Sequence, residues 1–374
     1  MKKMLFVSNC GSGKVGNFSI SNRLAAKELG IEFHMAAHYA DKTIIEEEGK
    51  KNGIYMHHID FKRNPFHPAN IKAYFQLKDL MKKEKFDIVH CNTPIGGLVG
   101  RICAKKVKVP YVIYTAHGFH FYKGAPWINQ VIYKNVEKWL AKYTDVLITI
   151  NQEDYEAAQK FKVKKGGSVK LVHGVGIDTK QFVLENFDRE NYRKKLELQD
   201  EDIMLISAGD LIKRKNYETA IKAVAECKNK NLQYYICGKG PRREGLLGLA
   251  KKLGIERQVH FLGYRTDIKE LMHCADIFLF TTYQEGLPRS MMEAMASNLP
   301  CIASEIRGNI DLIENGKGGY LCETTDVTAI AKDIQELAID KEKRNYMGKE
   351  NLKTIQTFDV EKIKKEYYEI YKKY

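Results

Sequence analysis

Residues 282–296 read TYQEGLPRSMMEAMA and follow the apolar run 277–281. The apolar run predicts a strand, and Pro288 suits the first turn of a helix, where its missing N–H costs no hydrogen bond. Glu285 then lies in the loop, and Glu293 lies about five residues into the helix. The segment therefore predicts a strand, a loop and a helix that together carry two carboxylates.

The two carboxylates and the helix start suit one class of ligand. A rise of about 1.5 Å per residue separates the carboxylates by roughly 8–12 Å, the distance from a ribose to a sugar joined through a diphosphate. A carboxylate accepts hydrogen bonds from adjacent hydroxyls, and the N–H groups near Gly286 and Leu287 attract an anion. Taken alone, the pattern equally fits an ordinary helix with two solvated glutamates.

Outward from this segment, strand-like runs alternate with helical patterns, which predicts parallel sheets covered by helices. Ligands bind beyond the carboxyl ends of such strands. We expect an α/β protein of two Rossmann-like domains, 1–180 and 200–357, facing an interdomain cleft, with the polar segment 178–202 as a linker. The predicted strands are Met4–Ser8, Phe33–Ala37, Tyr55–His58, Ile88–Cys91, Tyr111–Ala116, Val146–Ile150, Val169–His173, Ile203–Ala208, Gln233–Cys237, Val259–Leu262, Ile277–Thr281 and Pro300–Ala303.

The composition is that of a globular protein, with 44% hydrophobic and 29% charged residues among 374. No apolar run is long enough to span a bilayer, and the apolar start is too short for a signal peptide, so we expect a cytoplasmic protein. Without a C-x-x-C pair, the cysteines are expected to be buried thiols. The net charge is +14, and residues 51–150 hold 16 Lys and Arg against 6 Asp and Glu. The excess of positive charge indicates an anionic partner, such as a phosphorylated substrate or a lipid surface, more than a basic surface that only keeps the protein soluble.

A glycine-rich loop follows the first predicted strand. Residues 11–16 read GSGKVG and match the dinucleotide fingerprint, but no acidic residue ends the second strand, so NAD binding is poorly supported. We expect the loop, including Gly13, to contact some ligand. The acidic run 200–202 is interpreted as solvated linker, and the histidines show no metal-ligand spacing, so no metal site is predicted.

The order of motifs along the chain resembles that of the retaining glycosyltransferases of family 4, which have the GT-B fold. The resemblance covers almost the whole chain and looks closest to bacterial enzymes of exopolysaccharide and capsule synthesis. It rests on the two glutamates and on the segments 115–118, 173–178, 206–215, 237–241, 261–263, 274–277 and 316–321.

The resemblance implies roles for single residues. Glu293 would bind the ribose, Glu285 the transferred sugar, and Lys215 the diphosphate, where positive charge aids departure of the nucleotide. His117 would act near the sugar. Further donor contacts would come from Gly13, Gly209, Arg214, Gly286 and Leu287.

The same resemblance implies a metal-independent reaction with retention, in which the leaving phosphate takes the acceptor's proton and Glu285 is not a covalent nucleophile. Asp210 departs from the family, which often has Arg there, and Arg214 is the candidate replacement. Asp311 and His173 also differ, with little expected effect on the chemistry.

The implied activity is transfer of a sugar, of hexosyl type, from a nucleotide sugar such as a UDP-sugar to a glycan or a polyprenyl-diphosphate-linked sugar. Two alternatives stay open on the same fold: a nucleotide-sugar epimerase and a non-catalytic nucleotide-sugar-binding protein. Nucleic-acid binding lacks an aromatic-basic motif.

Two segments of the basic half are candidates for the acceptor or for the inner face of the cell membrane. Residues 71–85 show apolar residues at helical spacing with clustered lysines, including Lys82 and Lys83. The other segment, residues 119–123, contributes Phe119, His120, Tyr122 and Lys123. A last helix, about 358–374, is expected to cross back to the first domain.

Overall fold

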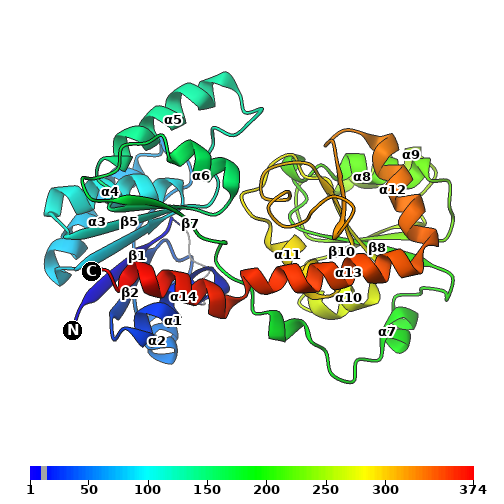
Figure 1. The fold of residues 1–374 in the computed structure, drawn as a ribbon, viewed down its shortest axis with the longest axis horizontal. Coiled ribbons are helices and arrows are strands. Elements are labelled where there is room, and N and C mark those ends of the chain that lie inside the picture. The colour runs from blue at the N-terminus through cyan, green and yellow to red at the C-terminus, as the bar shows by residue number, and fades with distance from the viewer. Residues whose placement is uncertain (10–14) are drawn as a thin grey trace. The chain divides into compact units, whose positions relative to one another are not determined.

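The computed structural model describes residues 1–9 and 15–374, apart from the side chain of Asn17. The chain forms two units (Figure 1). Unit 1 consists of residues 1–176 together with 360–374, and unit 2 consists of residues 177–359. Each unit has its own parallel sheet.

The sheet of unit 1 has seven strands in the order β3-β2-β1-β4-β5-β6-β7, all paired in parallel. Alternate residues of β1 point to opposite faces: Leu5 and Val7 join one apolar cluster, and Met4 and Phe6 join another. Both faces are therefore covered by helices, which explains why β1 is apolar from Met4 to Val7. The strands are β1 Lys3–Val7, β2 Glu32–Ala37, β3 Tyr55–His58, β4 Ile88–Asn92, β5 Tyr111–Ala116, β6 Val146–Thr149 and β7 Ser168–Leu171.

The C-terminal helix belongs to unit 1, where it packs against α1. The hydroxyl of Tyr371 accepts a hydrogen bond from Asn22 Nδ2 at 2.7 Å and lies 2.8 Å from His90 Nδ1. The helical segments of unit 1 are η1 Asn17–Ser19, α1 Ile20–Glu28, α2 Ile45–Asn52, α3 Ala69–Glu84, α4 Pro94–Val107, α5 Trp127–Ala141, α6 Gln152–Ala158 and α14 Val360–Tyr371.

The sheet of unit 2 has six parallel strands in the order β10-β9-β8-β11-β12-β13. The strands are β8 Ile203–Ala208, β9 Leu232–Cys237, β10 Val259–Gly263, β11 Ile277–Phe280, β12 Cys301–Ser304 and β13 Gly319–Cys322. The helical segments are η2 Thr179–Phe182, α7 Arg189–Lys195, η3 Lys213–Lys215, α8 Tyr217–Glu226, α9 Arg243–Lys252, α10 Ile268–Cys274, α11 Arg289–Ala296, α12 Val327–Ile339, α13 Lys341–Ile355 and η4 Gln356–Phe358.

The segment 178–202, expected to be a linker, folds as part of unit 2 and contains η2 and α7. Of the acidic run 200–202, expected to be solvated, Asp200 and Glu201 are exposed and Asp202 is not. The guanidinium of Arg193 is largely buried and donates to the carbonyl of Cys274 and to the Asp276 carboxylate. Asp202 is also buried, and its carboxylate accepts a bond from the Gln199 N–H at 2.8 Å.

Residues 319–321, expected in a loop, belong to the edge strand β13. A Cβ at Gly319 would lie 1.8 Å from the carbonyl oxygen of Cys301, so only glycine allows this strand to pair with β12. The seven cysteines in the described part of the chain are free and buried, as the sequence predicted, and Cys10 lies outside it. Among the described residues, no helix is long and apolar enough to cross a membrane.

Candidate functional site

The loop after β11 and the turn after β8 meet at the carboxyl edge of the unit 2 sheet, because these two strands are neighbours and parallel. The N–H of Tyr283 donates to the carbonyl of Arg214 at 2.9 Å, and the Thr282 hydroxyl lies 3.1 Å from the same carbonyl. These contacts bring the two segments singled out in the sequence, 209–215 and 282–293, into one site.

The carboxylate of Glu285 is the centre of this site. Its Oε1 accepts hydrogen bonds from Arg214 Nη1 at 2.7 Å and from Lys215 Nζ at 2.8 Å. The Thr282 hydroxyl lies 2.9 Å from the same oxygen. Within the part of the chain that the structure describes, these three contacts all end on Oε1, so Oε2 remains available to a hydroxyl ligand.

The two cations differ in burial. The side chain of Lys215 is 12% exposed and that of Glu285 is 11% exposed, whereas Arg214 is 40% exposed. Lys215 Nζ also lies 4.7 Å from the centre of the Phe280 ring. Charges interact more strongly at a site shielded from water, so Lys215 is the stronger candidate for stabilising a leaving phosphate, and Arg214 is a solvent-facing second cation.

Two glycine turns shape the floor of the site. A Cβ at Gly238 would lie 1.9 Å from the carbonyl oxygen of Gly209, so the turns after β8 and β9 can be this close only because residue 238 is glycine. Gly209 packs against Lys215, whose Cε would be 3.2 Å from an added Cβ, and its carbonyl accepts a bond from the Tyr217 hydroxyl at 3.0 Å. Asp210, beside it, is exposed.

The loop that carries Gly286 and Leu287 is held from a neighbouring segment. Arg307 is 5% exposed, and its Nε donates to the carbonyl of Glu285 at 3.0 Å. The next residue, Gly308, lies so close that a Cβ there would be 2.6 Å from the carbonyl oxygen of Gly286. Arg307 was not predicted as a site residue, because no motif links it to the loop of Glu285, 22 residues earlier. Thr282 and Tyr217 were not predicted either, although both lie close in the sequence to their partners Glu285 and Gly209.

Glu293 is the fifth residue of α11, and its Oε1 accepts a bond from Arg289 Nε at 2.8 Å. Its side chain is 20% exposed. Pro288 precedes the helix as its N-cap rather than occupying its first turn. The carboxylate is therefore held one helical turn from the helix start, in reach of a ligand that contacts the loop.

His117 follows β5 in unit 1 and is half-buried. Its Nε2 lies 3.0 Å from Asn92 Oδ1, and its ring lies 4.7 Å from that of Phe18. Burial lowers the pKa of His117 to about 4, so the imidazole is neutral near pH 7. If Nε2 carries the hydrogen, as its amide partner requires, Nδ1 is an acceptor.

The structure says nothing of Gly13, which lies outside the described residues together with most of the loop 11–16. The loop's last residues are described, and the N–H of Val15 donates to Glu48 Oε2 at 3.2 Å.

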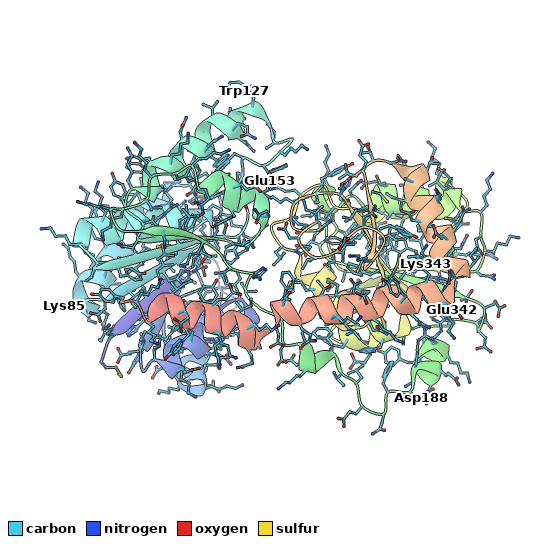
Figure 2. All side chains as sticks on the ribbon, viewed as in Figure 1. Lys85, Trp127, Glu153, Asp188, Glu342 and Lys343 are labelled. Atoms are coloured by element: carbon cyan, nitrogen blue, oxygen red, sulfur yellow. The ribbon has the colours of Figure 1, made fainter. Side chains whose placement is uncertain are left out.

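Phe119, a candidate for contact with the acceptor or the membrane, belongs to the core of unit 1. It is 2% exposed and stacks on Phe121 with ring centres 4.5 Å apart, because the segment after β5 turns its aromatic residues into the core. His120 is half-buried and stacks on Tyr133 at 4.8 Å, and Tyr122 is also half-buried. Lys123 is exposed, and its N–H donates to Glu153 Oε1, which comes from α6 (Figure 2).

The other candidate segment, α3, buries Leu77 and Met81 and exposes Lys82 and Lys83. It packs beside α4 in unit 1. Ile71 and Phe75 nevertheless remain exposed, with 65% and 52% of their surface in contact with solvent.

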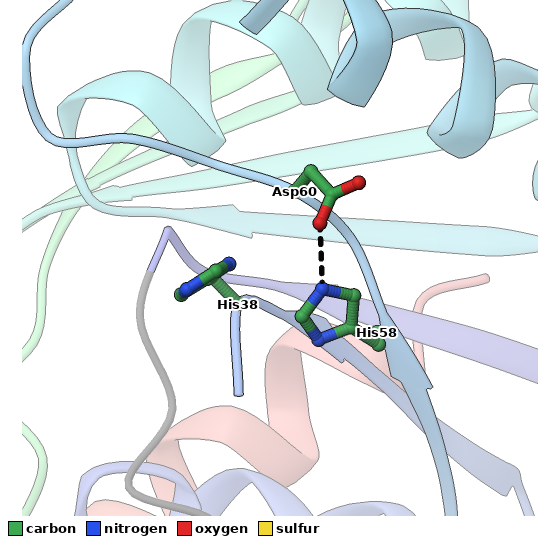
Figure 3. A group of neighbouring side chains, drawn as sticks. All are labelled: His38, His58 and Asp60. Atoms are coloured by element: carbon green, nitrogen blue, oxygen red, sulfur yellow. Dashed lines mark hydrogen bonds and ion pairs between the residues drawn. The ribbon is translucent and has the colours of Figure 1, made fainter. Parts of the chain in front are cut away.

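Three potential metal ligands, His38, His58 and Asp60, gather beyond β2 and β3 in unit 1 (Figure 3). No local pattern indicates this group, because 19 residues separate the two histidines and only the pairing of β2 with β3 brings them together. His58 Nε2 lies 2.8 Å from Asp60 Oδ1, and the other carboxylate oxygen of Asp60 binds Lys72. A metal here would have to displace the bond between His58 and Asp60, and a lysine would remain beside it.

Two protein-family models match the chain, one in each half. Residues 3–151 match the family model "Glycosyl transferase 4-like", and residues 188–354 match "Glycosyl transferases group 1". The chain is 36% identical to "Putative glycosyltransferase EpsD" of Bacillus subtilis (strain 168), over 93% of this chain and 91% of the relative.

A second relative is the Escherichia coli UDP-Gal:alpha-D-GlcNAc-diphosphoundecaprenol alpha-1,3-galactosyltransferase, which is 29% identical over 73% of this chain and 71% of its own. Among solved structures, HepE of Anabaena in complex with UDP and glucose superposes with a TM-score of 0.82 at 20% identity, covering 100% of both chains. The two Rossmann-like units thus have the GT-B fold. The chain belongs to the glycosyltransferases whose first part is of the glycosyl transferase 4-like type and whose second part is of group 1.

Proposed function

We propose that this glycosyltransferase moves a hexosyl group from a UDP-sugar to a polyprenyl-diphosphate-linked sugar during synthesis of a bacterial surface polysaccharide. The observation that carries the donor half of the proposal is the cluster of Glu285, Lys215 and Arg214 at the carboxyl edge of the unit 2 sheet. It combines an acceptor for sugar hydroxyls with two cations for a diphosphate. The acceptor half rests on the Escherichia coli relative, whose name specifies a diphosphoundecaprenol-linked substrate.

In the proposed reaction, the uridine ribose binds Glu293, and the sugar hydroxyls bind Glu285. Lys215 and Arg214 exchange part of their contact with Glu285 for the diphosphate and stabilise the charge that develops as the sugar–phosphate bond breaks. The leaving phosphate takes the proton of the acceptor hydroxyl on the same face, so the anomeric configuration is retained. No covalent sugar–enzyme bond and no metal ion are required.

His117 contributes as a neutral group in this scheme. Its lowered pKa, caused by burial, suits a hydrogen-bond partner of the sugar or the acceptor rather than a cationic acid. Asn92 orients the ring. Gly209, Gly286 and Leu287 supply backbone next to the diphosphate, and we retain Gly13 as a candidate donor contact.

A donor panel with a defined acceptor tests the proposal. The full chain is mixed with UDP-, GDP- and ADP-sugars, and the melting temperature is recorded, since a bound donor stabilises the fold. Turnover is then measured with a polyprenyl-diphosphate-linked N-acetylhexosamine, and the product's anomeric configuration is read by NMR. We expect a UDP-sugar to raise the melting temperature and to yield a retained linkage.

Glu285→Ala should abolish turnover, while Glu244→Ala, a matched change at a side chain that is 83% exposed in the same unit, should leave it intact. Interconversion of UDP-sugars without an acceptor would instead identify an epimerase. A thermal shift without turnover on any acceptor would favour a binding protein, and the lack of any shift would refute the donor site itself.

A further inference from the structure

The helix α5 of unit 1 keeps large apolar side chains in contact with solvent. At 100° per residue, these side chains fall on one face of the helix. They are Trp127, Ile128, Val131, Ile132 and Trp139, with exposed fractions of 76%, 48%, 50%, 51% and 45%. Figure 2 shows Trp127 at the end of α5, pointing away from the rest of unit 1. Four of the five lie within the first two turns of α5, and Trp139 follows two turns later, beyond the exposed Asn135. Exposed apolar side chains of this size mark an interaction site.

The opposite face of α5 attaches the helix to unit 1 through polar and aromatic contacts. Glu137 accepts a bond at 2.8 Å from Arg101 Nη2, and the Arg101 side chain is fully buried. Gln130 Nε2 donates to the carbonyl of Tyr122 at 2.9 Å, and the Tyr133 ring stacks on His120. The same face also buries Leu140 and Ala141, so α5 is anchored to unit 1 by apolar contacts as well, and the exposed apolar side chains are additional to those that hold the helix in place.

The charged side chains of α5 that reach solvent are lysines, and Glu153 of α6 accepts a bond from the Lys123 N–H before the start of the helix. Lys123, Lys138 and Lys142 are exposed beside the apolar face, and Lys134 lies half-buried on the same helix. The only acidic residue from 123 to 142 is Glu137, which is directed inward to Arg101. An occupant of this face must therefore combine an apolar interior with a negatively charged rim.

We propose that the exposed face of α5 binds the surface of an anionic lipid bilayer. Tryptophan favours the boundary between headgroups and acyl chains, and lysines beside it attract anionic headgroups. A helix of 15 residues, about 22 Å long, would lie flat in that boundary with its apolar side chains immersed. Binding of a bilayer by α5 goes beyond the proposed function. Its test measures vesicle binding and not sugar transfer, so either proposal can fail while the other stands.

The chain supplies its own probe, because its two tryptophans are Trp127 and Trp139, both on α5. The full chain is titrated with vesicles of phosphatidylcholine, with and without phosphatidylglycerol, at physiological salt, and intrinsic tryptophan emission is recorded. We expect a blue shift and quenching by brominated acyl chains, both stronger with phosphatidylglycerol. Vesicle binding without a change in tryptophan emission would place the contact elsewhere and overturn the proposal.

Matched double variants then locate the surface. V131S/I132S on α5 should weaken partitioning to anionic vesicles about 10- to 100-fold, because two half-exposed apolar side chains no longer enter the bilayer. I71S/F75S, the same kind of change on α3, should leave partitioning within about twofold. All four positions are exposed, so both variants should keep the wild-type melting temperature and its shift with nucleotide sugar.

Two further outcomes would refute the proposal. Equal loss in the two double variants would show that α5 has no special role. A blue shift that grows with protein concentration in the absence of lipid, together with a dimer by light scattering, would assign the face to a second copy of the chain.

Discussion

Replacing Glu285 with Gln should have opposite effects on nucleotide binding and on sugar transfer. The carboxylate accepts bonds from Lys215 and Arg214 at 2.8 and 2.7 Å, and a diphosphate would compete for the same N–H groups. Gln keeps an oxygen for these donors and for Thr282 but removes the charge. We therefore expect UDP to bind more tightly to Glu285→Gln, while transfer falls because the sugar hydroxyls lose their charged acceptor.

The burial of the two ion pairs of Glu285 determines how much free energy the substitution changes. The Lys215–Glu285 pair is almost buried, and a charge-assisted bond there contributes about 1.5–3 kcal/mol, of which the amide retains roughly half. The Arg214 pair is 40% exposed at the arginine, so solvent screening reduces it to about 0–1 kcal/mol. The free energy of unfolding should fall by about 1–2 kcal/mol. The affinity for UDP should rise by roughly 3- to 10-fold, which corresponds to about 0.7–1.4 kcal/mol.

Calorimetric titration with UDP and with the UDP-sugar, beside steady-state transfer, measures both effects. Transfer should fall by about 100-fold or more, as is typical when a charged partner of the reacting group is removed. Glu293→Gln is the matched control, because loss of a ribose contact should weaken UDP and UDP-sugar alike. If UDP binds Glu285→Gln more weakly than the wild type, the carboxylate organises the cations instead of competing for them, and the reasoning is wrong.

Three further changes test other parts of the structure. Gly238→Ala would place a Cβ 1.9 Å from the Gly209 carbonyl oxygen, so it should lower the free energy of unfolding by about 3 kcal/mol or remove the thermal shift with donor. Gly245→Ala is the control, because open space surrounds that residue and neither effect is expected. Arg101→Met should destabilise unit 1 by about 3–5 kcal/mol in urea unfolding, since it leaves Glu137 without its buried partner, and R101M/E137Q should recover part of the loss. Burial lowers the pKa of His90 to about 3, so the free energy of unfolding should fall as the pH decreases from 6.5, by roughly 2–3 kcal/mol at pH 4.5. A His90→Gln variant whose stability depends on pH in the same way as the wild type's would contradict this.

Protonation of His90 should destabilise the folded chain. The unfolded chain binds a proton near pH 6.5, whereas the folded chain holds a neutral ring between Tyr371 and Thr115. Protons therefore favour the unfolded state throughout the interval between the two pKa values. Other buried histidines act in the same direction, so the difference between wild type and variant is the quantity to measure.

Local sequence patterns predicted most of the fold. Parallel strands buried on both faces are continuous apolar runs, so strands such as β1, β4 and β8 were evident. The loop with Glu285 and the helix with Glu293 were also evident, because proline and glycine mark a helix start within a few residues. These features depend on neighbours in the chain.

The errors share a physical cause. Asp202 looked solvated, and Phe119 looked like a surface residue, because burial depends on which distant segment covers a side chain. The edge strand β13 was not predicted, because it begins at Gly319. Glycine is required at this position only because the Cys301 carbonyl oxygen of the neighbouring strand leaves no room for a Cβ. Periodicity along the chain carries no information on such approaches.

The sequence by itself determined the alternation of strands and helices, which follows from short-range patterning, whereas the residues at the centre of the candidate site were implied by the resemblance to a known family. Only the tertiary structure decided that Arg214 and Lys215 meet Glu285 on one oxygen and that Arg307 supports the same loop. It also decided which side of α5 faces unit 1: Leu140 and Ala141 are buried there and Glu137 meets the buried Arg101, while Trp127, Val131 and Ile132 stay exposed. The energy of a buried ion pair depends on contacts between residues far apart in the chain, and no local pattern encodes it.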